Sequence, residues 1–364
     1  MSEFPIGWNK VPIGSAFSVS SGDMNMTKTT YKSSGFIAFS ASGPDGFVEQ
    51  FQHEGDGIVV SSVGAKAGRV FKSSGRWTAI KNTIVISQKN LLFDINYLFY
   101  HLSTEGALFQ EGGAQPFVSQ KQIQTTEIGF PPLPEQKKIA EILSGIDERI
   151  VASQNQEKYY SLLLESTLRD SFSHEADETK TLGEIAEFKS GRAFKSEELS
   201  EDGIKVTRIS NLHKPNFPYW RYKGEYNPRI VARDGDILFS WAGVANSINV
   251  HRYKGENTLL NQHIYNFEFC DQLLKEWTYW NLKTMLPKLR ASIEGGAGQL
   301  HLTKGFIQSL PIPVIERSRM ESLCNCFQSI DHLVEIQKIA STKAKALKTA
   351  LSLDLLSGSK RVSI

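Results

Sequence analysis

The same order of features occurs twice along this 364-residue chain, in residues 13–151 and again in residues 182–335. The two copies begin alike, with Gly14 and Gly22 in the first and Gly183 and Gly191 in the second, at a constant offset of 169 residues. A period of roughly 170–184 residues is too long for a solenoid repeat and is typical of a duplicated domain. Two similar domains on one chain indicate a protein that contacts one object at two places.

Further paired segments follow in the same order in both copies. They are a Gly-Asp dipeptide before an apolar run, a Gly-rich loop, and a proline-rich exit into a long helix. The pairs are Gly55-Asp56-Gly57-Ile58 with Gly235-Asp236-Ile237-Leu238, Gly112-Gly113-Ala114-Gln115 with Gly295-Gly296-Ala297-Gly298-Gln299, and Pro131-Pro132-Leu133-Pro134 with Pro311-Ile312-Pro313. Proline ends a strand and suits the first turn of a helix, so these exits mark domain boundaries.

Each copy mixes short β-rich runs with Gly and Ser turns and one helix-like stretch, which predicts an α+β domain of about 130–140 residues. The strands expected are Gly57–Val63 and Thr83–Ser87 in the first copy, and Lys205–Ile209, Asp236–Trp241 and His263–Phe269 in the second. The helices expected are Ile95–Gln110 and Gln272–Arg290.

A long helix is predicted after each exit, from Pro134 to about Phe172 and from Met320 to about Leu356, because apolar residues recur there at helical spacing. Both stripes weaken in the middle, at 153–158 and 337–342. Such a helix is roughly 55–60 Å long, more than one small domain needs. Two ordinary amphipathic helices packed on their own domains are the alternative to a pair of spacer helices. Opposite charges favour the pair, since residues 133–175 carry 5 basic and 8 acidic residues and 316–364 carry 8 and 5.

The bulk composition excludes some classes of protein. A net charge of only +2 argues against a uniformly basic nucleic-acid-binding protein. Three cysteines argue against a disulfide framework and favour a reducing cytosol. No apolar run is long enough to span a membrane, and the first five residues do not resemble a signal peptide. We therefore expect a soluble, cytoplasmic protein that does not contact a membrane.

The first exit carries a motif that resembles a known family. The run Leu133-Pro134-Glu135-Gln136-Lys137-Lys138-Ile139-Ala140-Glu141-Ile142-Leu143, followed by Ile146-Asp147, is similar to the start of the conserved helix in specificity subunits of type I restriction–modification systems. With the duplication, the resemblance covers essentially the whole chain. The second exit departs from it, because Pro313-Val314-Ile315-Glu316-Arg317 replaces the Pro-Glu-Gln form. This departure bears on the symmetry of the helix starts and of the partner contacts.

The resemblance implies an architecture: two similar target-recognition domains joined by two long antiparallel spacer helices, with an internal pseudo-twofold repeat. The recognition domains would span residues 1–132 and 174–315, the spacer helices 133–173 and 316–358, and a tail 359–364. Each domain would read one half of a split, asymmetric site in double-stranded DNA, and the helices would set the number of base pairs between the halves.

The resemblance also implies partners. Two methyltransferase subunits, which methylate adenine N6 with S-adenosylmethionine, would dock on such a chain. Two restriction subunits, which use ATP and Mg²⁺ for translocation and cleavage, join for restriction. The chain itself would be non-catalytic and hold no cofactor.

The residues that contact DNA are predicted first in the paired Gly-rich loops. Gln115 and Gln299 carry the donor and acceptor that bind adenine bidentately, and glycines allow close backbone approach. Tight turns with solvated glutamines are the alternative. The candidates in and beside the loops are Gly113, Gln115, Ser119, Gly298, Gln299, His301 and Thr303.

A second group of candidates is basic or borders a predicted turn. Lys66 and Arg69 follow the Gly-Asp strand of the first copy and are expected to contact phosphates, unless they are solvated loop cations. Ser190, Arg192 and Lys195 contact phosphate or guanine, or else belong to a surface turn. Arg221 and Lys223 alternate with aromatic residues, which also suits a strand with one buried face. Asn261-Gln262-His263, which opens a strand, is interpreted as structural.

Catalytic motifs are missing from the sequence. It has no Asn/Asp-Pro-Pro-aromatic methyltransferase motif, no phosphate-binding loop and no His-Glu-x-x-His metal motif. Pro44-Asp45 lacks the downstream lysine that a nuclease of this type needs. An enzyme acting on small molecules is therefore disfavoured. A free-standing DNA-binding protein such as a repressor remains the other alternative, and co-purification with a methyltransferase would separate it from a specificity subunit.

Overall fold

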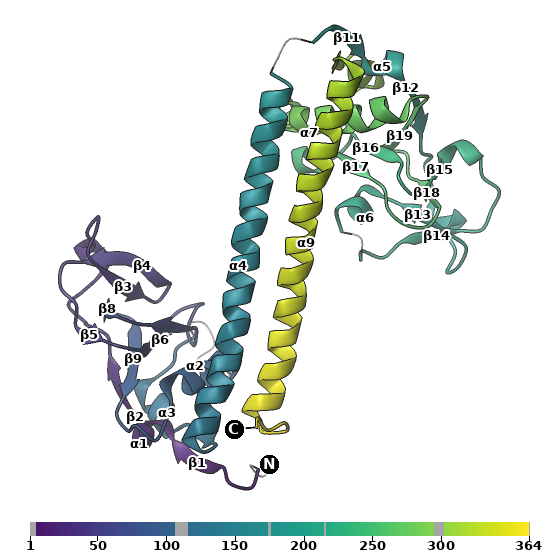
Figure 1. The fold of residues 1–364 in the computed structure, drawn as a ribbon. Helices are drawn as coiled ribbons and strands as arrows, with labels where there is room; N and C mark the ends of the chain where they lie inside the picture. The colour runs from purple at the N-terminus through teal and green to yellow at the C-terminus, as the bar shows by residue number, and fades with distance from the viewer. Residues whose placement is uncertain (1–4, 106–115, 174–175, 215, 295–301, 364) are drawn as a thin grey trace. The chain divides into compact units, whose positions relative to one another are not determined.

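The computed structural model describes residues 5–105, 116–173, 176–214, 216–294 and 302–363, which form two compact units (Figure 1). Unit 1 consists of Met1–Gln154 and Lys338–Ile364, and unit 2 of Asn155–Gln337. Both boundaries fall inside the long helices, at the positions where the apolar stripes are weakest in the sequence. Each unit therefore contains one recognition domain with half of each long helix.

The described residues of the domain of unit 1 include ten short strands. Its strands are β1 (Asn9–Pro12), β2 (Phe17–Ser21), β3 (Phe36–Ser40), β4 (Gly43–Val48), β5 (His53–Glu54), β6 (Gly57–Ser61), β7 (Val70–Ser73), β8 (Arg76–Ala79), β9 (Thr83–Gln88) and β10 (Glu127–Phe130). Its helices are α1 (Ile13–Ala16), the 3₁₀ helix η1 (Lys28–Thr30), α2 (Ile95–Glu105) and α3 (Gln120–Thr125).

These strands form two four-stranded sheets, ordered β2-β9-β6-β7 and β4-β3-β8-β5, and a ribbon of β1 with β10. All pairs are antiparallel except β3 with β8. The Val and Ile residues of β6 and β9 are buried, as β-branched side chains in central strands usually are.

The domain of unit 2 repeats this plan. Its strands are β11 (Glu178–Thr181), β12 (Ala186–Ser190), β13 (Ile204–Thr207), β14 (Trp220–Tyr222), β15 (Val231–Ala232), β16 (Ile237–Ser240), β17 (Asn249–Arg252), β18 (Thr258–Leu260), β19 (Ile264–Phe269) and β20 (Pro311–Val314). Its helices are α5 (Leu182–Ile185), η3 (Ser196–Glu198), α6 (Ile209–His213), η4 (Pro228–Ile230), η5 (Ala245–Ser247), α7 (Gln272–Glu294) and α8 (Lys304–Gln308).

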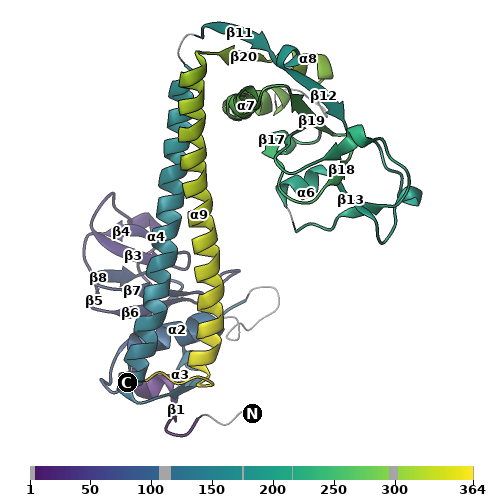
Figure 2. The same ribbon diagram turned by 45° about the vertical axis from the view of Figure 1, so that its right-hand side comes forward.

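The sheets of unit 2 have the orders β12-β19-β16-β17 and β14-β13-β18-β15, with a ribbon of β11 and β20. Strand for strand these match the sheets of unit 1, including the single parallel pair, here β13 with β18. Helix α7 packs against β17 and β19 (Figure 2). The predicted α+β class with an internal repeat is confirmed.

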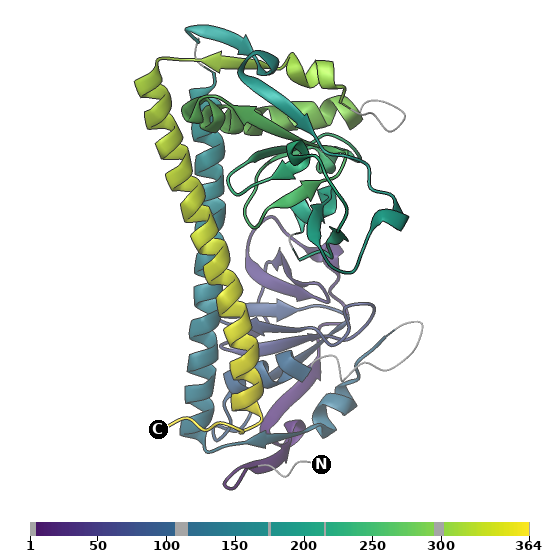
Figure 3. The same cartoon turned by 90° about the vertical axis from the view of Figure 1, so that its right-hand side faces the viewer.

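The long helices are α4 (Leu133–Ser171) and α9 (Arg317–Leu356). In unit 1 the first half of α4 lies beside the second half of α9 (Figure 3). Asp147 of α4 forms an ion pair with Lys348 Nζ of α9 at 2.6 Å. In unit 2 the end of α4 meets the start of α9, where Phe172, just after α4, stacks on Phe327 with ring centroids 6.1 Å apart. Within each unit the helices are therefore antiparallel.

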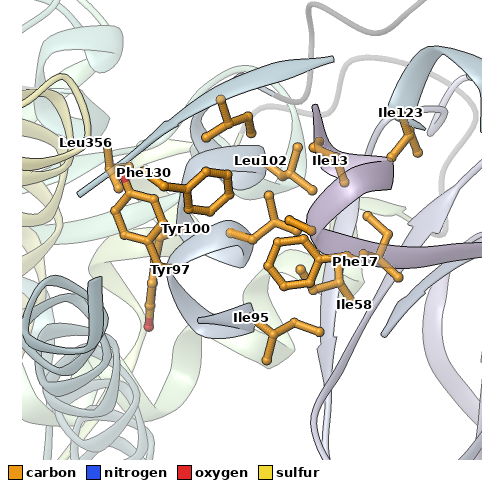
Figure 4. Packing of buried hydrophobic residues seen from close by; sticks show 14 of the residues in the cluster. Ile13, Phe17, Ile58, Ile95, Tyr97, Tyr100, Leu102, Ile123, Phe130 and Leu356 are labelled. Carbon is orange, nitrogen blue, oxygen red and sulfur yellow. The ribbon is translucent and has the colours of Figure 1, made fainter. Parts of the chain in front are cut away.

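Each unit has a core that joins its sheet to both helices. In unit 1 the cluster includes Phe17, Tyr97 and Phe130 of the domain and Leu356 of α9 (Figure 4). Leu143 of α4 belongs to the same cluster. In unit 2 it includes Phe239, Trp277 and Trp280 of the domain, Leu168 of α4 and Phe327 of α9. Neither domain completes its core without residues from both long helices.

The two long helices start at equivalent places despite their different sequences. Leu133 follows the end of β10 by three residues, and Arg317 follows the end of β20 by three. At α9, the Glu316 carboxylate accepts hydrogen bonds from the backbone N–H groups of Ser318 and Arg319 at 3.0 and 3.1 Å, as an N-cap does. The expectation that α9 begins near Met320 is therefore three residues late.

Several other predicted boundaries are wrong by a few residues. The strand expected over 205–209 ends at Thr207, because the Asn211 side chain accepts from the Arg208 N–H at 3.1 Å and closes the first turn of α6. The strand expected over 57–63 ends at Ser61, and the one over 263–269 begins at Ile264. The part of the predicted helix Ile95–Gln110 beyond Glu105 lies outside the described residues.

Candidate nucleic-acid interface

A cleft opens in unit 1 where β3 ends and where the chain turns from β8 into β9. It has a volume of about 200 Å³ and is lined by Thr27, Lys28, Ser40, Ala41, Ser42, Ile80, Lys81 and Asn82. The parallel pairing of β3 with β8 brings these two strand ends together. Asn82 has a φ of 70°, which the turn before β9 imposes and which asparagine tolerates better than most residues. We call this the first cleft.

One wall of the first cleft is fixed by a hydrogen-bond network around Asp45 at the surface of the domain. The carboxylate accepts from Lys28 Nζ at 2.5 Å, from the Tyr31 hydroxyl at 2.7 Å and from the Ser40 hydroxyl at 2.7 Å. Burial alone raises the pKa of Asp45, but these hydrogen bonds outweigh burial and hold the pKa below its ordinary value. The charge of Lys28 is thus already paired, and Lys81 is the other lysine in the lining.

The predicted residues Lys66 and Arg69 lie in the loop beside this cleft. Lys66 Nζ donates to the Ser42 hydroxyl at 3.4 Å, so Lys66 borders the cleft. Arg69 is exposed, and its carbonyl oxygen accepts from the Ser61 N–H at 2.9 Å. The loop is joined to the cleft lining because the Ser62 N–H donates to the Asn82 carbonyl at 3.0 Å.

The chain that follows the Gly-rich loop of the first copy contacts the loop beside this cleft. Gly113 and Gln115 lie outside the described residues, but the chain resumes at Pro116, whose carbonyl accepts from the Gly64 N–H at 2.9 Å. The Val118 N–H then donates to the Ser62 carbonyl at 2.8 Å. Ser119 caps α3, with its hydroxyl accepting from the Gln122 N–H at 3.1 Å. Its side chain therefore has a structural hydrogen bond.

Unit 2 has a cleft at the equivalent place, which we call the second cleft. It lies where β13 ends and just before β19, has a volume of about 850 Å³, and is bounded on the other side by the loop after β16. The lining residues are Ile209, Ser210, His213, Lys214, Ala242, Gly243, Val244, Asn246, Ser247 and His263. None of them is acidic. Asn261-Gln262-His263, interpreted from the sequence as structural, thus brings His263 into the cleft lining.

The wall behind the second cleft is cationic. His213 meets the half-buried His251 at a ring-centroid distance of 5.2 Å, and Arg290 Nε donates to the Ile248 carbonyl at 3.0 Å. Burial lowers the pKa of His251 to about 3, and repulsion from His213, Lys283 and Arg290 adds to this effect. His251 is therefore neutral at pH 7, and the local positive charge comes from Lys214, Lys283 and Arg290.

The basic residues predicted in the second domain lie elsewhere, around the sheet that contains β13 and β14. Arg192 pairs with Glu198 at 2.7 Å and lies over the rings of Phe194 and Tyr222. Arg221 donates to the Gly203 carbonyl at 2.9 Å, and Lys223 pairs with Asp202 at 2.6 Å. Each of these three charges has a partner within the domain, and none of the three lines the second cleft.

The remaining predicted residues of the second domain are placed as follows. Ser190 is the exposed last residue of β12, and Lys195 is exposed just before η3. Thr303 caps α8, accepting from the Phe306 N–H at 3.2 Å, as Ser119 caps α3. Gly298, Gln299 and His301 lie outside the described residues.

Sequence reasoning missed most of the residues that line the two clefts, although it placed Lys66 in the loop beside the first and named His263 of the second as a structural residue. His213, Lys214 and Asn246 come together only because the ends of β13 and β16 and the start of β19 border the same cleft. The usable signal was the repeat itself. The turn before β9 and the turn before β19 occupy the same register against β2 and β12, so the two copies align residue by residue there.

Comparison with known proteins identifies the class. Residues 5–159 and again 175–315 match the family described as the type I restriction modification DNA specificity domain, so the chain belongs to this family. It is 26% identical over 334 residues to the type I restriction enzyme MjaVIII specificity subunit of Methanocaldococcus jannaschii, covering 82% of this chain and 78% of that relative.

Solved structures show the same fold. The S subunit of a type I restriction-modification system from M. genitalium superposes with a TM-score of 0.75 at 18% identity, over 98% of this chain and 97% of that one. A structure on complex assembly and conformational transition of the type I R-M system gives a TM-score of 0.54 at 18% identity, over 98% and 99% of the two chains.

Two further observations concern the described residues only. None of their helices is both long enough and apolar enough to cross a membrane. Among the same residues, no group of three or more His, Cys, Asp or Glu side chains is arranged to hold a metal ion.

Proposed function

We propose that this chain is the DNA sequence-recognition subunit of a type I restriction–modification complex, in which each domain reads one half of a split, asymmetric site. The observation that carries the proposal is the duplicated cleft. In each domain, polar and basic groups line the cleft at the ends of equivalent strands. Neither cleft lining contains an unpaired carboxylate. Base edges are read by such amide, hydroxyl and basic groups, while lysine and arginine also bind phosphates.

The long helices supply the spacer in this proposal. Helix α4 contains 39 residues and is therefore about 58 Å long at about 1.5 Å per residue, somewhat over one and a half turns of B-DNA. Because both helices contribute to both cores, a change in helix length is transmitted to the domains at their ends. The helices then fix the number of unread base pairs between the half-sites.

The helices also offer surfaces for two methyltransferase subunits. In unit 1, Val151, Ile339, Leu347 and Leu353 are each more than half exposed. In unit 2, Tyr159 and Leu162 are more than half exposed, and Ile336 is 42% exposed. Apolar residues exposed on a helix pair are costly to leave in water, and they favour a bound partner over a free-standing repressor. The partners would supply S-adenosylmethionine and adenine-N6 chemistry, and restriction subunits would supply ATP- and Mg²⁺-dependent cleavage.

This chain would then contribute recognition without catalysis, beside DNA in the cytoplasm. The test is methylation mapping by single-molecule sequencing in cells that carry the chain with its neighbouring methyltransferase gene, compared with cells lacking the chain. We expect N6-methyladenine on both strands of a split motif, lost when the chain is deleted. Methylation that persists without the chain would contradict the proposal.

The same mapping tests the spacer. Lengthening or shortening α4 and α9 together by whole turns, within 153–158 and 337–342, should change the spacer and leave both half-site sequences as they are. Altered half-sites with an unchanged spacer would contradict the role of the helices. Changing the helices by half a turn serves as the control, and it should abolish methylation because the domains then face different sides of the DNA.

A further inference from the structure

The loop between β16 and β17 forms the outer wall of the second cleft, and its conformation is fixed. The Ser247 N–H donates to the Val244 carbonyl at 2.7 Å, and the Ile248 N–H donates to the Ala245 carbonyl at 3.1 Å. Ile248 anchors the loop, since it is fully buried. Gly243 has a φ of 104°, so the bend that begins the loop requires glycine. A loop held this way presents its side chains without a large ordering cost on binding.

Two side chains of this loop are presented to solvent without an internal role. Val244 is 72% exposed although it is apolar. Asn246 is exposed, and its carboxamide makes no hydrogen bond to any residue that the structure describes. Nearby asparagines differ in this respect, because Asn211 donates to the Phe217 carbonyl and the Asn249 side chain accepts from the Val250 N–H. Neither Val244 nor Asn246 is explained by the stability of the fold.

The chemistry of this pair matches one kind of base pair. An asparagine carboxamide donates a hydrogen bond to N7 of adenine and accepts one from the N6 amino group of the same base. An apolar side chain contacts the C5-methyl group of thymine. A carboxylate, which would accept from cytosine N4, is missing from the lining, and so is an arginine fork for guanine. Lys214, on the opposite wall, has the charge to bind a backbone phosphate.

We propose that Asn246 and Val244 read an A·T base pair in the half-site recognised by the second domain, with Asn246 on the adenine and Val244 on the thymine methyl group. This inference rests on the proposed function, because it assigns the base pair that one of the two clefts reads. The residues stand two positions apart on one rigid loop, so a single base pair presents both targets within their reach.

The test removes single functional groups from protein and DNA together. The complex of this chain with its methyltransferase subunits is bound to duplexes of the mapped site. In the second half-site, each thymine is replaced in turn by uracil, which lacks the methyl group, and each adenine by 7-deazaadenine, which lacks N7. We expect one A·T pair at which uracil weakens the wild-type complex but not Val244→Ala, and at which 7-deazaadenine weakens the wild type but not Asn246→Ala.

The Asn246→Ala substitution should cost about 5- to 150-fold in affinity for the unmodified site, the range for a bidentate base contact. Asn246→Asp, which keeps the shape but only accepts hydrogen bonds, should shift preference at that pair towards cytosine. Asn257→Ala is the matched control, since Asn257 is exposed on another loop of the same domain and should leave binding unchanged.

Three results would overturn the inference: a second half-site without an A·T pair, equal sensitivity of variant and wild type to both base analogues, or equal losses on all duplexes. A wild-type complex that shows no sequence preference at all would instead overturn the proposed function. The two failures are therefore distinguishable in one experiment.

Discussion

The two recognition domains share their strand order and registers but differ at their clefts. The first cleft is small and contains a lysine already neutralised by Asp45, whereas the second has about four times the volume and no carboxylate in its lining. The sheets behind them are matched strand for strand. The difference shows that side chains at strand ends change the surface without disturbing the core. A duplicated scaffold can therefore present two different recognition surfaces.

The substitution with the largest expected effect tests whether the two units unfold independently of each other. Phe327→Ala removes a fully buried ring that packs on Phe172 and Trp280, and it should destabilise unit 2 by about 3–5 kcal/mol. Hydrogen exchange read peptide by peptide measures where protection is lost. We expect the loss in residues 155–337, with β2, β6 and β9 still protected. Loss of equal size in both units would show that they unfold as one body.

The second prediction concerns the folding stability of unit 2 at acidic pH. His251 has its pKa lowered to about 3 in the folded chain, below the value of about 6.5 when unfolded, so the unfolded state binds more protons between these values. Stability from this group is present above pH 6.5 and is lost as the pH falls towards 3, by about 3 kcal/mol at pH 4.

Urea unfolding of unit 2 at pH 7 and pH 4 measures this loss. His251→Gln should reduce the pH dependence, while His332→Gln, at an exposed position of α9, serves as the control and should retain it. His101 in unit 1 is also buried with its pKa lowered to about 4, so unit 1 should lose a comparable contribution. An unchanged slope in the His251 variant would show that carboxylates alone govern acid unfolding.

A third prediction sharpens the comparison at the Gly-rich loops. Gln299→Ala should alter specificity only at the half-site read by the second domain, and Gln115→Ala only at the other, each by about 1–3 kcal/mol of discrimination. Methylation of a library of randomised half-sites measures both. Equal losses at both halves from either substitution would indicate a general effect on folding or on phosphate binding.

The smallest expected effect concerns charge at the first cleft. Lys66→Ala should weaken binding to all sequences alike and lower the slope of log affinity against log salt by about one, as expected for a lost phosphate contact. Lys28→Ala should change the slope less, because Lys28 is paired with Asp45. Affinities of both variants for DNA, measured across a salt series, give the two slopes to be compared. A larger change for Lys28 would mean that the pair opens when DNA binds.

The duplication and the long helices were predictable because they depend on local patterns. Glycine positions, proline exits and apolar stripes recur at fixed spacings, and they predicted the class of fold and both helices. The clefts were not predictable in the same way. His213 and Asn246 are 33 positions apart in sequence, and they line one cleft only because the fold brings the end of β13, in one sheet, near the end of β16, in the other. Arg192, Arg221 and Lys223 were chosen for their charge, but carboxylates and carbonyls of the same domain, at Glu198, Gly203 and Asp202, hold them.

The sharing of the long helices between the units has a consequence for synthesis. Leu355 and Leu356 belong to the core of unit 1, and Arg361 binds the nearly buried carboxylate of Glu135 through two hydrogen bonds of 2.6 Å. These residues leave the ribosome after the whole of unit 2. Unit 2, a continuous stretch of chain, has all its core residues earlier.

The domain translated first is therefore completed last. From the emergence of Ile139 to that of Leu355, roughly 200 residues are added, which takes on the order of 10–40 s at about 5–20 residues per second. During this time the face of α4 that α9 later covers is open to solvent or to other chains. We expect the nascent first domain to depend on chaperones more than the second.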